Sequence, residues 1–244
     1  MSVRDLADYP WDAVAPFRER AAAHPDGIVD LAIGSPVDPT PEIIRRALSE
    51  ATDAHSYPQT VGTPALREAI VDWYARRRGV PDLRVDNVMP TIGSKELVAL
   101  LPTLLGLGEG DIVVQPRVAY PTYAVGAQVV GATVVSEDDP ALWPEGARLI
   151  WINTPGNPDG RTWTVEELTE AVRRARELGA VLASDECYAE LGWDGPWVTE
   201  RVPSVLDHAF LAEDCVDFDA ADAAVDATDW AEIEDQSGLT RAEI

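Results

Sequence analysis

The chain has 244 residues, of which 46% are hydrophobic, and a formal net charge of −24. That length supports either one substantial hydrophobic core or one core with part of a second unit. The negative charge disfavours nucleic acid as a partner because neutralising phosphates requires clustered lysine and arginine. The longest apolar run, at residues 97–107, is interrupted by Pro102 and Gly106 and is too short for a membrane span. We therefore expect a globular protein that binds neither nucleic acid nor a membrane.

Two further features bear on the compartment and on charge. Cys187 and Cys215 are the two cysteines of the chain, too few for a disulfide framework, and the N-terminus lacks the basic and apolar layout of a signal peptide. We expect a cytoplasmic protein. The densest basic run is Arg76-Arg77-Arg78, which we interpret as the solvated end of a helix, where cations complement the helix dipole.

The first third of the chain is predicted to be helical with turns. Three prolines within residues 1–26 indicate an arm with one short helix. Residues 42–51 and 63–78 have helical patterns, with Pro41 placed just inside the first helix, and the loop between them contains Tyr57.

A candidate anion site follows. Within residues 89–96, a short extended segment meets the start of an apolar-faced helix, which Gly93, Ser94 and Lys95 open. Gly93 allows a tight turn, and the free amides of a first helical turn favour an anion such as phosphate. The alternative is that Ser94 is an ordinary helix N-cap.

The central part of the chain alternates strand patterns with helix patterns, which is typical of a mostly parallel sheet covered by helices. Strands are predicted at residues 111–115, 132–136, 148–152 and 180–184, and helices at 121–130 and from Thr164 to about 178. Thr164 and Glu167 form a capping box, and Gly179 is placed to end the second helix. Asp185 follows the last strand, at the sheet edge where ligands bind in open α/β folds. The alternative for Asp185 is an acid that simply ends a strand at the surface.

Two motifs at the strand ends resemble the class I/II aminotransferases of fold type I, which depend on pyridoxal phosphate. They are Asn153-Thr-Pro-Gly-Asn157-Pro158-Asp-Gly160 and Ser184-Asp185-Glu186-Cys187-Tyr188. The resemblance covers about residues 10–203 and is greatest to the succinyldiaminopimelate aminotransferases of actinobacteria. That subgroup is suggested by five phrases of the sequence: His24-Pro-Asp-Gly-Ile-Val-Asp-Leu31, Ile92-Gly-Ser-Lys-Glu-Leu97, Leu101-Pro-Thr-Leu-Leu-Gly106, Ala119-Tyr-Pro-Thr-Tyr123, and Asp185-Glu-Cys-Tyr188 with Leu191-Gly-Trp193. It implies a three-layer α/β fold with the large domain of a fold type I transferase.

The resemblance also implies roles for single residues in cofactor binding. Gly93, Ser94 and Lys95 would hold the phosphate, and Tyr120 would stack on the ring. Asp185 would pair with the ring nitrogen, since a carboxylate in a dry site keeps that nitrogen protonated. Asn157 and Tyr188 would donate to the phenolic oxygen of the cofactor.

Other residues are implied to act on the substrate and on a second subunit. Tyr57 would reach the phosphate in a neighbouring subunit, so that the protein is a homodimer, and Gly34 would lie near the substrate carboxylate. The substrates would be an amino acid and a keto acid: an amino group would pass from glutamate to a keto acid such as N-succinyl-2-amino-6-ketopimelate, in lysine and diaminopimelate biosynthesis.

The chain departs from the family pattern after Pro203. The family continues with a Ser-x-Ser-Lys segment that carries the Schiff-base lysine, a phosphate-binding arginine and a small C-terminal domain. Here an Ala/Asp segment follows, with eleven acids against Arg241 between Glu213 and Ile244, and Lys95 is the sole lysine. Lys95 would lie on the phosphate side of the cofactor, away from the aldehyde. We therefore expect a C-terminally truncated, inactive chain, produced by a frameshift, a premature gene end or a mis-assigned reading frame.

The expected domains are an N-terminal arm at 1–30, an incomplete cofactor-binding large domain at 31–205 and an acidic tail at 206–244 that is disordered or aberrant, with a partner-binding tail as the alternative. The alternative function is a non-catalytic α/β protein that binds pyridoxal phosphate or partners an intact subunit. A hydrolase is disfavoured because His24, His55 and His208 belong to no nucleophile and base arrangement.

Overall fold

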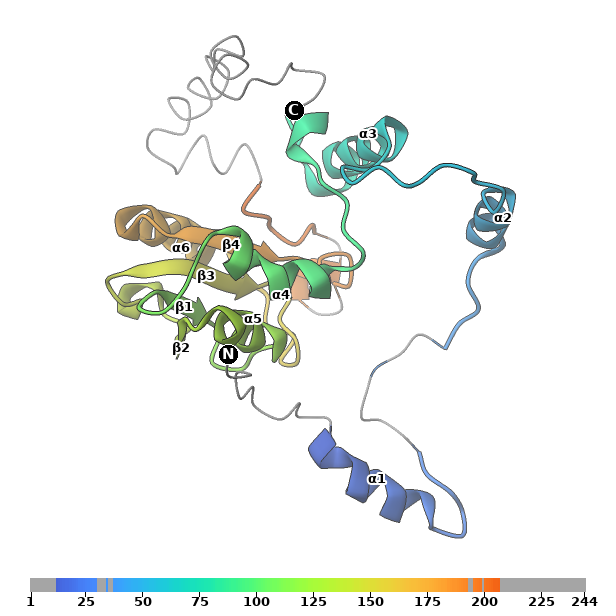
Figure 1. The fold of residues 1–244 in the computed structure, drawn as a ribbon, viewed down its shortest axis with the longest axis horizontal. Helices are drawn as coiled ribbons and strands as arrows, with labels where there is room; N and C mark the ends of the chain where they lie inside the picture. The colour runs from blue at the N-terminus through green and yellow to red at the C-terminus, as the bar shows by residue number, and fades with distance from the viewer. Residues whose placement is uncertain (1–11, 30–33, 35–36, 193–194, 199, 207–244) are drawn as a thin grey trace. The chain divides into compact units, whose positions relative to one another are not determined.

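The computed structural model describes residues 12–29, 34, 37–192, 195–198 and 200–206, and it divides into two compact units with a boundary between Leu66 and Arg67. The first unit contains a 3-10 turn at Asp12–Val14, α1 at Ala15–Ala22 and α2 at Glu42–Glu50. Both helices confirm the predicted elements (Figure 1). Pro41 is the N-cap of α2 with an extended ψ of 140°, so it lies just outside the helix instead of inside it. Neither α1 nor α2 contains a buried residue.

The second unit is built on a four-stranded parallel sheet with the strand order β2-β1-β3-β4. Its strands are β1 at Ile112–Gln115, β2 at Thr133–Ser136, β3 at Ala147–Asn153 and β4 at Val181–Asp185. Each matches a predicted strand to within one residue or so at either end. All four strands run parallel, so their carboxyl ends lie along one edge, as expected for an α/β protein.

Helices cover both faces of this sheet, which confirms the three-layer architecture (Figure 1). On one face, Val113 and Leu149 pack with Tyr123 of α5, the helix at Thr122–Val130. On the other face, Val114 and Ile150 pack with the helix α6 at Val165–Leu178. Alternate residues of β1 and β3 thus face opposite layers, and burying each large aliphatic side chain contributes about 1.5–3 kcal/mol.

The helix predicted at 63–78 changes geometry before its end. The α-helix α3 covers Pro64–Trp73, and a π-helical turn follows at Tyr74–Arg78, closed by Gly79 in the left-handed conformation with φ 72°. The prediction that the whole arginine run is solvated is wrong for Arg78. Its side chain is only 1% exposed and is paired with Glu186, because the π turn directs it into the protein.

The helix α4 at Ser94–Leu104 begins as predicted. Its N-cap is Gly93, with φ 81°, and no side chain caps it, so the alternative of Ser94 as an ordinary N-cap is wrong. The helix packs on α5 where the backbone of Val98 and Ala99 approaches Gly126. A Cβ at that glycine would meet carbonyl oxygens at 3.0 Å.

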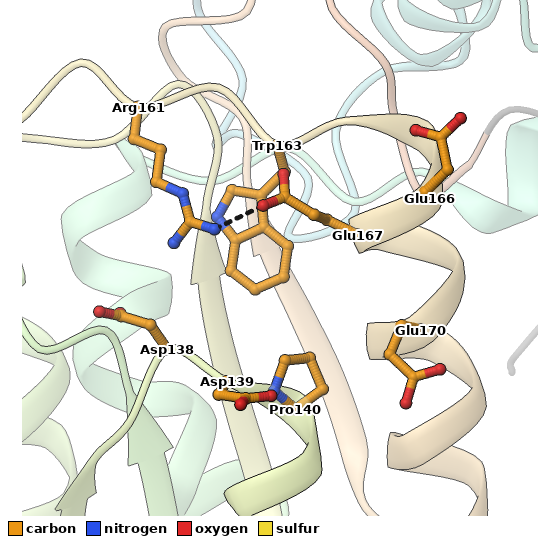
Figure 2. A pocket seen from close by; sticks show the side chains of 8 residues that line it. All are labelled: Asp138, Asp139, Pro140, Arg161, Trp163, Glu166, Glu167 and Glu170. Atoms are coloured by element: carbon orange, nitrogen blue, oxygen red, sulfur yellow. Dashed lines mark hydrogen bonds and ion pairs between the residues drawn. The ribbon is translucent and has the colours of Figure 1, made fainter.

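The helix α6 is fixed at both ends, as its sequence predicts. The Thr164 hydroxyl accepts from the Glu167 amide, and the Glu167 carboxylate accepts from the Thr164 amide. The same carboxylate also accepts from Arg161, as Figure 2 shows. Gly179 ends the helix with φ 64°.

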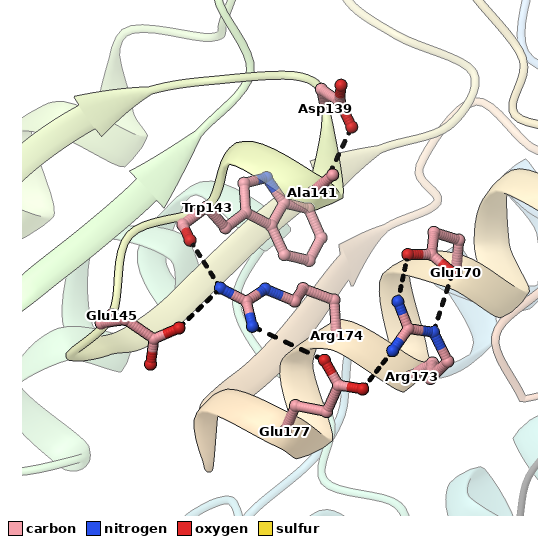
Figure 3. Close-up of polar contacts among 8 residues, drawn as sticks. All are labelled: Asp139, Ala141, Trp143, Glu145, Glu170, Arg173, Arg174 and Glu177. Atoms are coloured by element: carbon pink, nitrogen blue, oxygen red, sulfur yellow. Dashed lines mark hydrogen bonds and ion pairs between the residues drawn. The ribbon is translucent and has the colours of Figure 1, made fainter.

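Along its length α6 is tied to the segment that contains a 3-10 turn at Pro140–Leu142. Arg174 donates to the Trp143 carbonyl at 3.1 Å and to Glu145 at 2.9 Å, while Arg173 pairs with Glu170 and Glu177 (Figure 3). The Arg174 contacts hold α6 over the sheet face that Trp143 helps to fill, whereas the Arg173 pairs lie within the helix.

Two short 3-10 turns complete the described elements, at Val85–Asn87 and Gly195–Val198. Within the described part of the chain, no helix has the length and apolar character needed to cross a bilayer. The acidic segment predicted from residue 206 lies, apart from Leu206, outside the described residues.

Candidate functional site

The candidate site begins where β3 and β4 end side by side. Asn153, the last residue of β3, is in register with Asp185, the last residue of β4. The Asn153 side-chain amide donates to the Asp185 carbonyl at 2.8 Å, and the Thr154 amide donates to the same carbonyl at 3.1 Å. These bonds fix the backbone from which the Asp185 carboxylate projects.

The loop after β3 brings a second predicted pair together. The Asn157 backbone amide donates to the Asn153 side-chain oxygen at 2.8 Å, which folds the loop back over the strand end. The Asn157 side-chain amide then donates to the Tyr188 hydroxyl at 3.2 Å. Asn157 and Tyr188, which are both predicted to donate to the phenolic oxygen of the cofactor, are therefore in direct contact.

The Asp185 carboxylate has partners that the sequence analysis did not assign. Its Oδ2 accepts a hydrogen bond of 2.7 Å from the Tyr123 hydroxyl, and its Oδ1 accepts one of 3.2 Å from the Cys187 backbone amide. The Tyr123 ring is fully buried and stacks on Trp151, with centroids 4.9 Å apart. Tyr120 meets the Tyr123 ring edge-on at 6.0 Å. We call Tyr120, Tyr123, Trp151 and Asp185 the tyrosine cluster.

Burial and the Asp185 charge raise the pKa values of the ionisable groups around Asp185. Desolvation, followed by the charge and hydrogen bond of Asp185, raises the pKa of Tyr123 far above its usual range. Desolvation and Asp185 likewise raise the pKa of the Cys187 thiol to about 12. The pKa of Tyr188 is raised by burial and by Cys187, Asp185 and Tyr120, against the lowering effect of the Asn157 hydrogen bond. At neutral pH these groups are therefore neutral donors.

The next residue, Glu186, faces a different environment. Its carboxylate accepts hydrogen bonds from Arg78 at 3.3 Å, from the Ser184 hydroxyl at 3.1 Å and from the Ser204 hydroxyl at 2.9 Å. Arg78 is 1% exposed and Glu186 is 12% exposed. Burial and the Glu186 charge raise the pKa of neighbouring Tyr74. We call Arg78, Tyr74, Ser184, Glu186 and Ser204 the arginine cluster.

The remaining predicted site residues belong to α4 and to the first unit. Gly93, Ser94 and Lys95 lie at the exposed start of α4, and α4 packs on α5, the helix that carries Tyr123. At Gly93 the positive φ is what requires glycine, because a Cβ there would meet no atom within 4 Å. Gly34 and Tyr57 belong to the first unit, and the Tyr57 side chain is exposed. Their roles stay predictions.

A separate cavity of about 450 Å³ lies between the segment after β2 and the start of α6 (Figure 2). Its lining residues are Asp138, Asp139, Pro140, Arg161, Trp163, Glu166, Glu167 and Glu170. The Arg161 guanidinium lies over the Trp163 ring, 4.9 Å from its centroid, and pairs with Glu167. None of the residues predicted to bind a cofactor lines it, so the cavity is not the site that the strand ends form.

Comparisons with known proteins place these features in a family. Residues 26–218 match the family described as aminotransferase class I and II. The chain is 50% identical over 208 residues to the 4-dedimethylamino-4-oxo-anhydrotetracycline transaminase OxyQ of Streptomyces rimosus, covering 85% of this chain and 56% of that protein. It is 49% identical over 203 residues to the probable aminotransferase Rv1178 of Mycobacterium tuberculosis, covering 83% and 49%.

More distant relatives agree with this match. The LL-diaminopimelate aminotransferase of Desulforudis audaxviator is 32% identical over 244 residues, covering 93% of this chain and 61% of that protein. Among solved structures, aminotransferase AspB of Helicobacter pylori is similar with a TM-score of 0.74 and 26% identity, covering 86% of this chain and 58% of that one. The chain spans about half the length of the first two curated relatives.

Proposed function

Because this chain belongs to the class I and II aminotransferases, which depend on pyridoxal phosphate, we propose that the ends of β3 and β4 hold the ring of that cofactor. The observation that carries the proposal is the carboxylate of Asp185. In the described residues its hydrogen bonds come from neutral donors, the Tyr123 hydroxyl and the Cys187 amide. Its negative charge therefore stays available for a cation such as a protonated pyridine nitrogen.

The other groups at the strand ends fit the same ligand. The Asn157 amide and the Tyr188 hydroxyl, 3.2 Å apart, would donate to the phenolic oxygen of the ring, and the half-buried Tyr120 would stack on its face. Gly93, Ser94 and Lys95 would bind the phosphate, since a helix start presents unpaired amides to an anion. When bound, the cofactor supplies an electron sink for the carbon atom that exchanges its amino group.

The assignments in the first unit rest on the family resemblance. Gly34 would lie near the substrate carboxylate, and Tyr57 would reach the phosphate of a neighbouring subunit in a homodimer. The corresponding domains would be an N-terminal arm at 1–30, a cofactor-binding domain at 31–205 and an acidic tail at 206–244, in a cytoplasmic protein. The exposure of Tyr57 is compatible with a contact to a second subunit.

We further propose that the substrates are glutamate and a keto acid such as N-succinyl-2-amino-6-ketopimelate, in lysine and diaminopimelate biosynthesis. The sequence phrases shared with succinyldiaminopimelate aminotransferases support this choice, as does the similarity to LL-diaminopimelate aminotransferases. The relative OxyQ is named for a different keto substrate, so a tetracycline-type ketone is the competitor to include in any assay.

Catalysis by this 244-residue chain alone is a separate matter. Its single lysine is Lys95, in the first turn of α4, where the family places phosphate binding instead of the covalent lysine. Without a suitably placed lysine there is no base to move the proton of the substrate carbon. We expect the chain to bind the cofactor without turnover. The alternative is a non-catalytic protein that binds pyridoxal phosphate or partners an intact subunit.

The proposal is tested by titrating the purified chain with pyridoxal phosphate and, in parallel, with pyridoxal, which lacks the phosphate. We expect saturable binding of pyridoxal phosphate, weaker binding of pyridoxal, and no 2-oxoglutarate from glutamate with either keto substrate. Absence of saturable binding would overturn the proposed cofactor site. Turnover, or a borohydride-reduced adduct on Lys95 found by mass spectrometry, would overturn the expected inactivity.

Reading the gene beyond the codon for Ile244 separates the two functional alternatives. A segment encoding Ser-x-Ser-Lys in any frame would favour descent from a working aminotransferase. Its absence would favour the non-catalytic protein.

A further inference from the structure

The hydroxyl of Tyr123 has one well-defined position. Its ring is fully buried, stacked on Trp151 at 4.9 Å with an interplanar angle of 23°, and met edge-on by Tyr120. Tyr123 is also the second residue of α5, so its backbone is held by the helix. The hydroxyl therefore acts as a rigid support, 2.7 Å from Oδ2 of Asp185.

This hydroxyl is always a donor to the carboxylate. Burial and the nearby Asp185 charge raise the pKa of Tyr123 well above its usual range, so the phenol keeps its proton throughout the neutral and mildly alkaline range. With the Cys187 amide on Oδ1 at 3.2 Å, both carboxylate oxygens accept hydrogen bonds from neutral donors. The plane of the carboxylate is thus set before any ligand arrives, by donors that carry no charge.

We propose that Tyr123 is a positioning residue, which orients the Asp185 carboxylate toward the ring nitrogen of pyridoxal phosphate. The inference rests on the proposed function of the strand ends. It predicts that loss of the Tyr123 hydroxyl weakens cofactor binding through the ring nitrogen alone, because the hydroxyl acts on the ligand only by way of Asp185. The expected loss is about tenfold, equivalent to one hydrogen bond to a charged group.

The test uses the complete chain and two ligands: pyridoxal phosphate and 1-deaza-pyridoxal phosphate, in which C–H replaces the ring nitrogen. Dissociation constants are measured for the unsubstituted chain, for Tyr123→Phe, and for Tyr74→Phe, which removes the hydroxyl of a half-buried tyrosine near Glu186. We expect Tyr123→Phe to bind pyridoxal phosphate about tenfold more weakly and the deaza analogue within about twofold of the unsubstituted chain. Tyr74→Phe should change neither constant by more than about twofold.

A double-mutant cycle adds a readout that general loosening of the structure would not reproduce. In the Asp185→Asn background, Tyr123→Phe should have little further effect on the affinity for pyridoxal phosphate. If Tyr123→Phe does not fold, 3-fluorotyrosine at position 123 keeps the ring and hydroxyl while altering donor strength. It should then change the affinity for pyridoxal phosphate but not that for the deaza analogue.

The outcomes distinguish the two levels of the account. Equal losses for both ligands, or an undiminished effect of Tyr123→Phe in the Asp185→Asn background, would overturn the positioning role while leaving the proposed cofactor site intact. Failure of the unsubstituted chain to bind either ligand would overturn the proposed function and this inference with it. A loss confined to the ligand that has a ring nitrogen would support both.

Discussion

Asp185 and Glu186 are neighbours in the chain, yet they lie in clusters of opposite character. Asp185, in the tyrosine cluster, accepts hydrogen bonds from neutral donors, the Tyr123 hydroxyl and the Cys187 amide. Glu186 accepts from the Arg78 guanidinium and two serine hydroxyls in the arginine cluster. A cation inside the protein satisfies the second charge. The comparison teaches that the partner of an acid, more than its burial, indicates whether its charge remains available for a ligand.

Breaking the arginine cluster should have the largest effect on stability. Arg78→Leu leaves the largely buried Glu186 without its cation, which we expect to lower the free energy of unfolding by about 3–5 kcal/mol. Chemical denaturation measures the change. The adjacent Arg77→Leu is the matched control. The Arg77 side chain is 60% exposed and pairs with Glu190, and such exposed ion pairs contribute about 0.2–1 kcal/mol to the free energy of unfolding.

A second substitution tests the reason for that loss. In the combination of Arg78→Leu with Glu186→Leu no charge is left without a partner, so part of the lost stability should return. An effect of Arg78→Leu no larger than that of Arg77→Leu would show that the Arg78–Glu186 pair is not the structural element that we describe.

The negative charge of Asp185 should be detectable through its effect on the pKa of Cys187. Burial and Asp185 raise the pKa of this thiol from 9.0 to about 12, so alkylation by iodoacetamide should rise with pH well above the range of a free cysteine. Asp185→Asn should move the midpoint of the rate profile down toward 9, and Glu186→Gln should leave it in place. If Glu186→Gln lowered the midpoint and Asp185→Asn left it in place, Glu186 would carry the available charge.

The same shift fixes the sign of an effect on stability. The folded chain binds the Cys187 proton more tightly than the unfolded chain does. The contribution of Cys187 to stability is therefore complete below about pH 9 and is lost as the pH rises toward 12. Cys187→Ala should reduce this alkaline loss, as measured by denaturation at a series of pH values.

The smallest expected loss of stability comes from a single exposed hydrogen bond outside both clusters. Thr164→Ala removes the side-chain cap of α6 and should lower the free energy of unfolding by about 1 kcal/mol. It should leave cofactor affinity and the Cys187 midpoint unchanged. A change in either would mean that α6 is coupled to the strand ends in a way that the described contacts do not explain.

The sequence predicted the sheet unit well because its signals are local. Apolar runs marked the four strands, and the Thr164 and Glu167 capping box marked the start of α6. Asp185 was recognised as a candidate because it lies at the end of a predicted strand, and Asn157 through the family resemblance. The helix at 63–78 was predicted with the wrong geometry after Trp73, since nothing in Tyr-Ala-Arg-Arg-Arg separates a π turn from an α-helix.

The pairings between distant residues were not accessible in this way. Arg78 lies 108 residues before Glu186, and within a run of three arginines it has no local feature that distinguishes it as buried. Tyr123 lies 62 residues before Asp185. The phrase Tyr-Pro-Thr-Tyr did draw attention to Tyr120, and the second tyrosine, one helical turn away, is the signal that would have indicated a paired role.

The central claim is that Asp185 keeps its charge for the cofactor while Glu186 gives its charge to the protein. The most direct test compares the affinity for pyridoxal phosphate of Asp185→Asn and Glu186→Gln in the complete chain. We expect Asp185→Asn to weaken binding by about 10- to 100-fold, the loss of one interaction with a charged group, and Glu186→Gln to lower stability with little change in affinity. Unchanged affinity in Asp185→Asn, or a larger loss in a folded Glu186→Gln, would contradict the account.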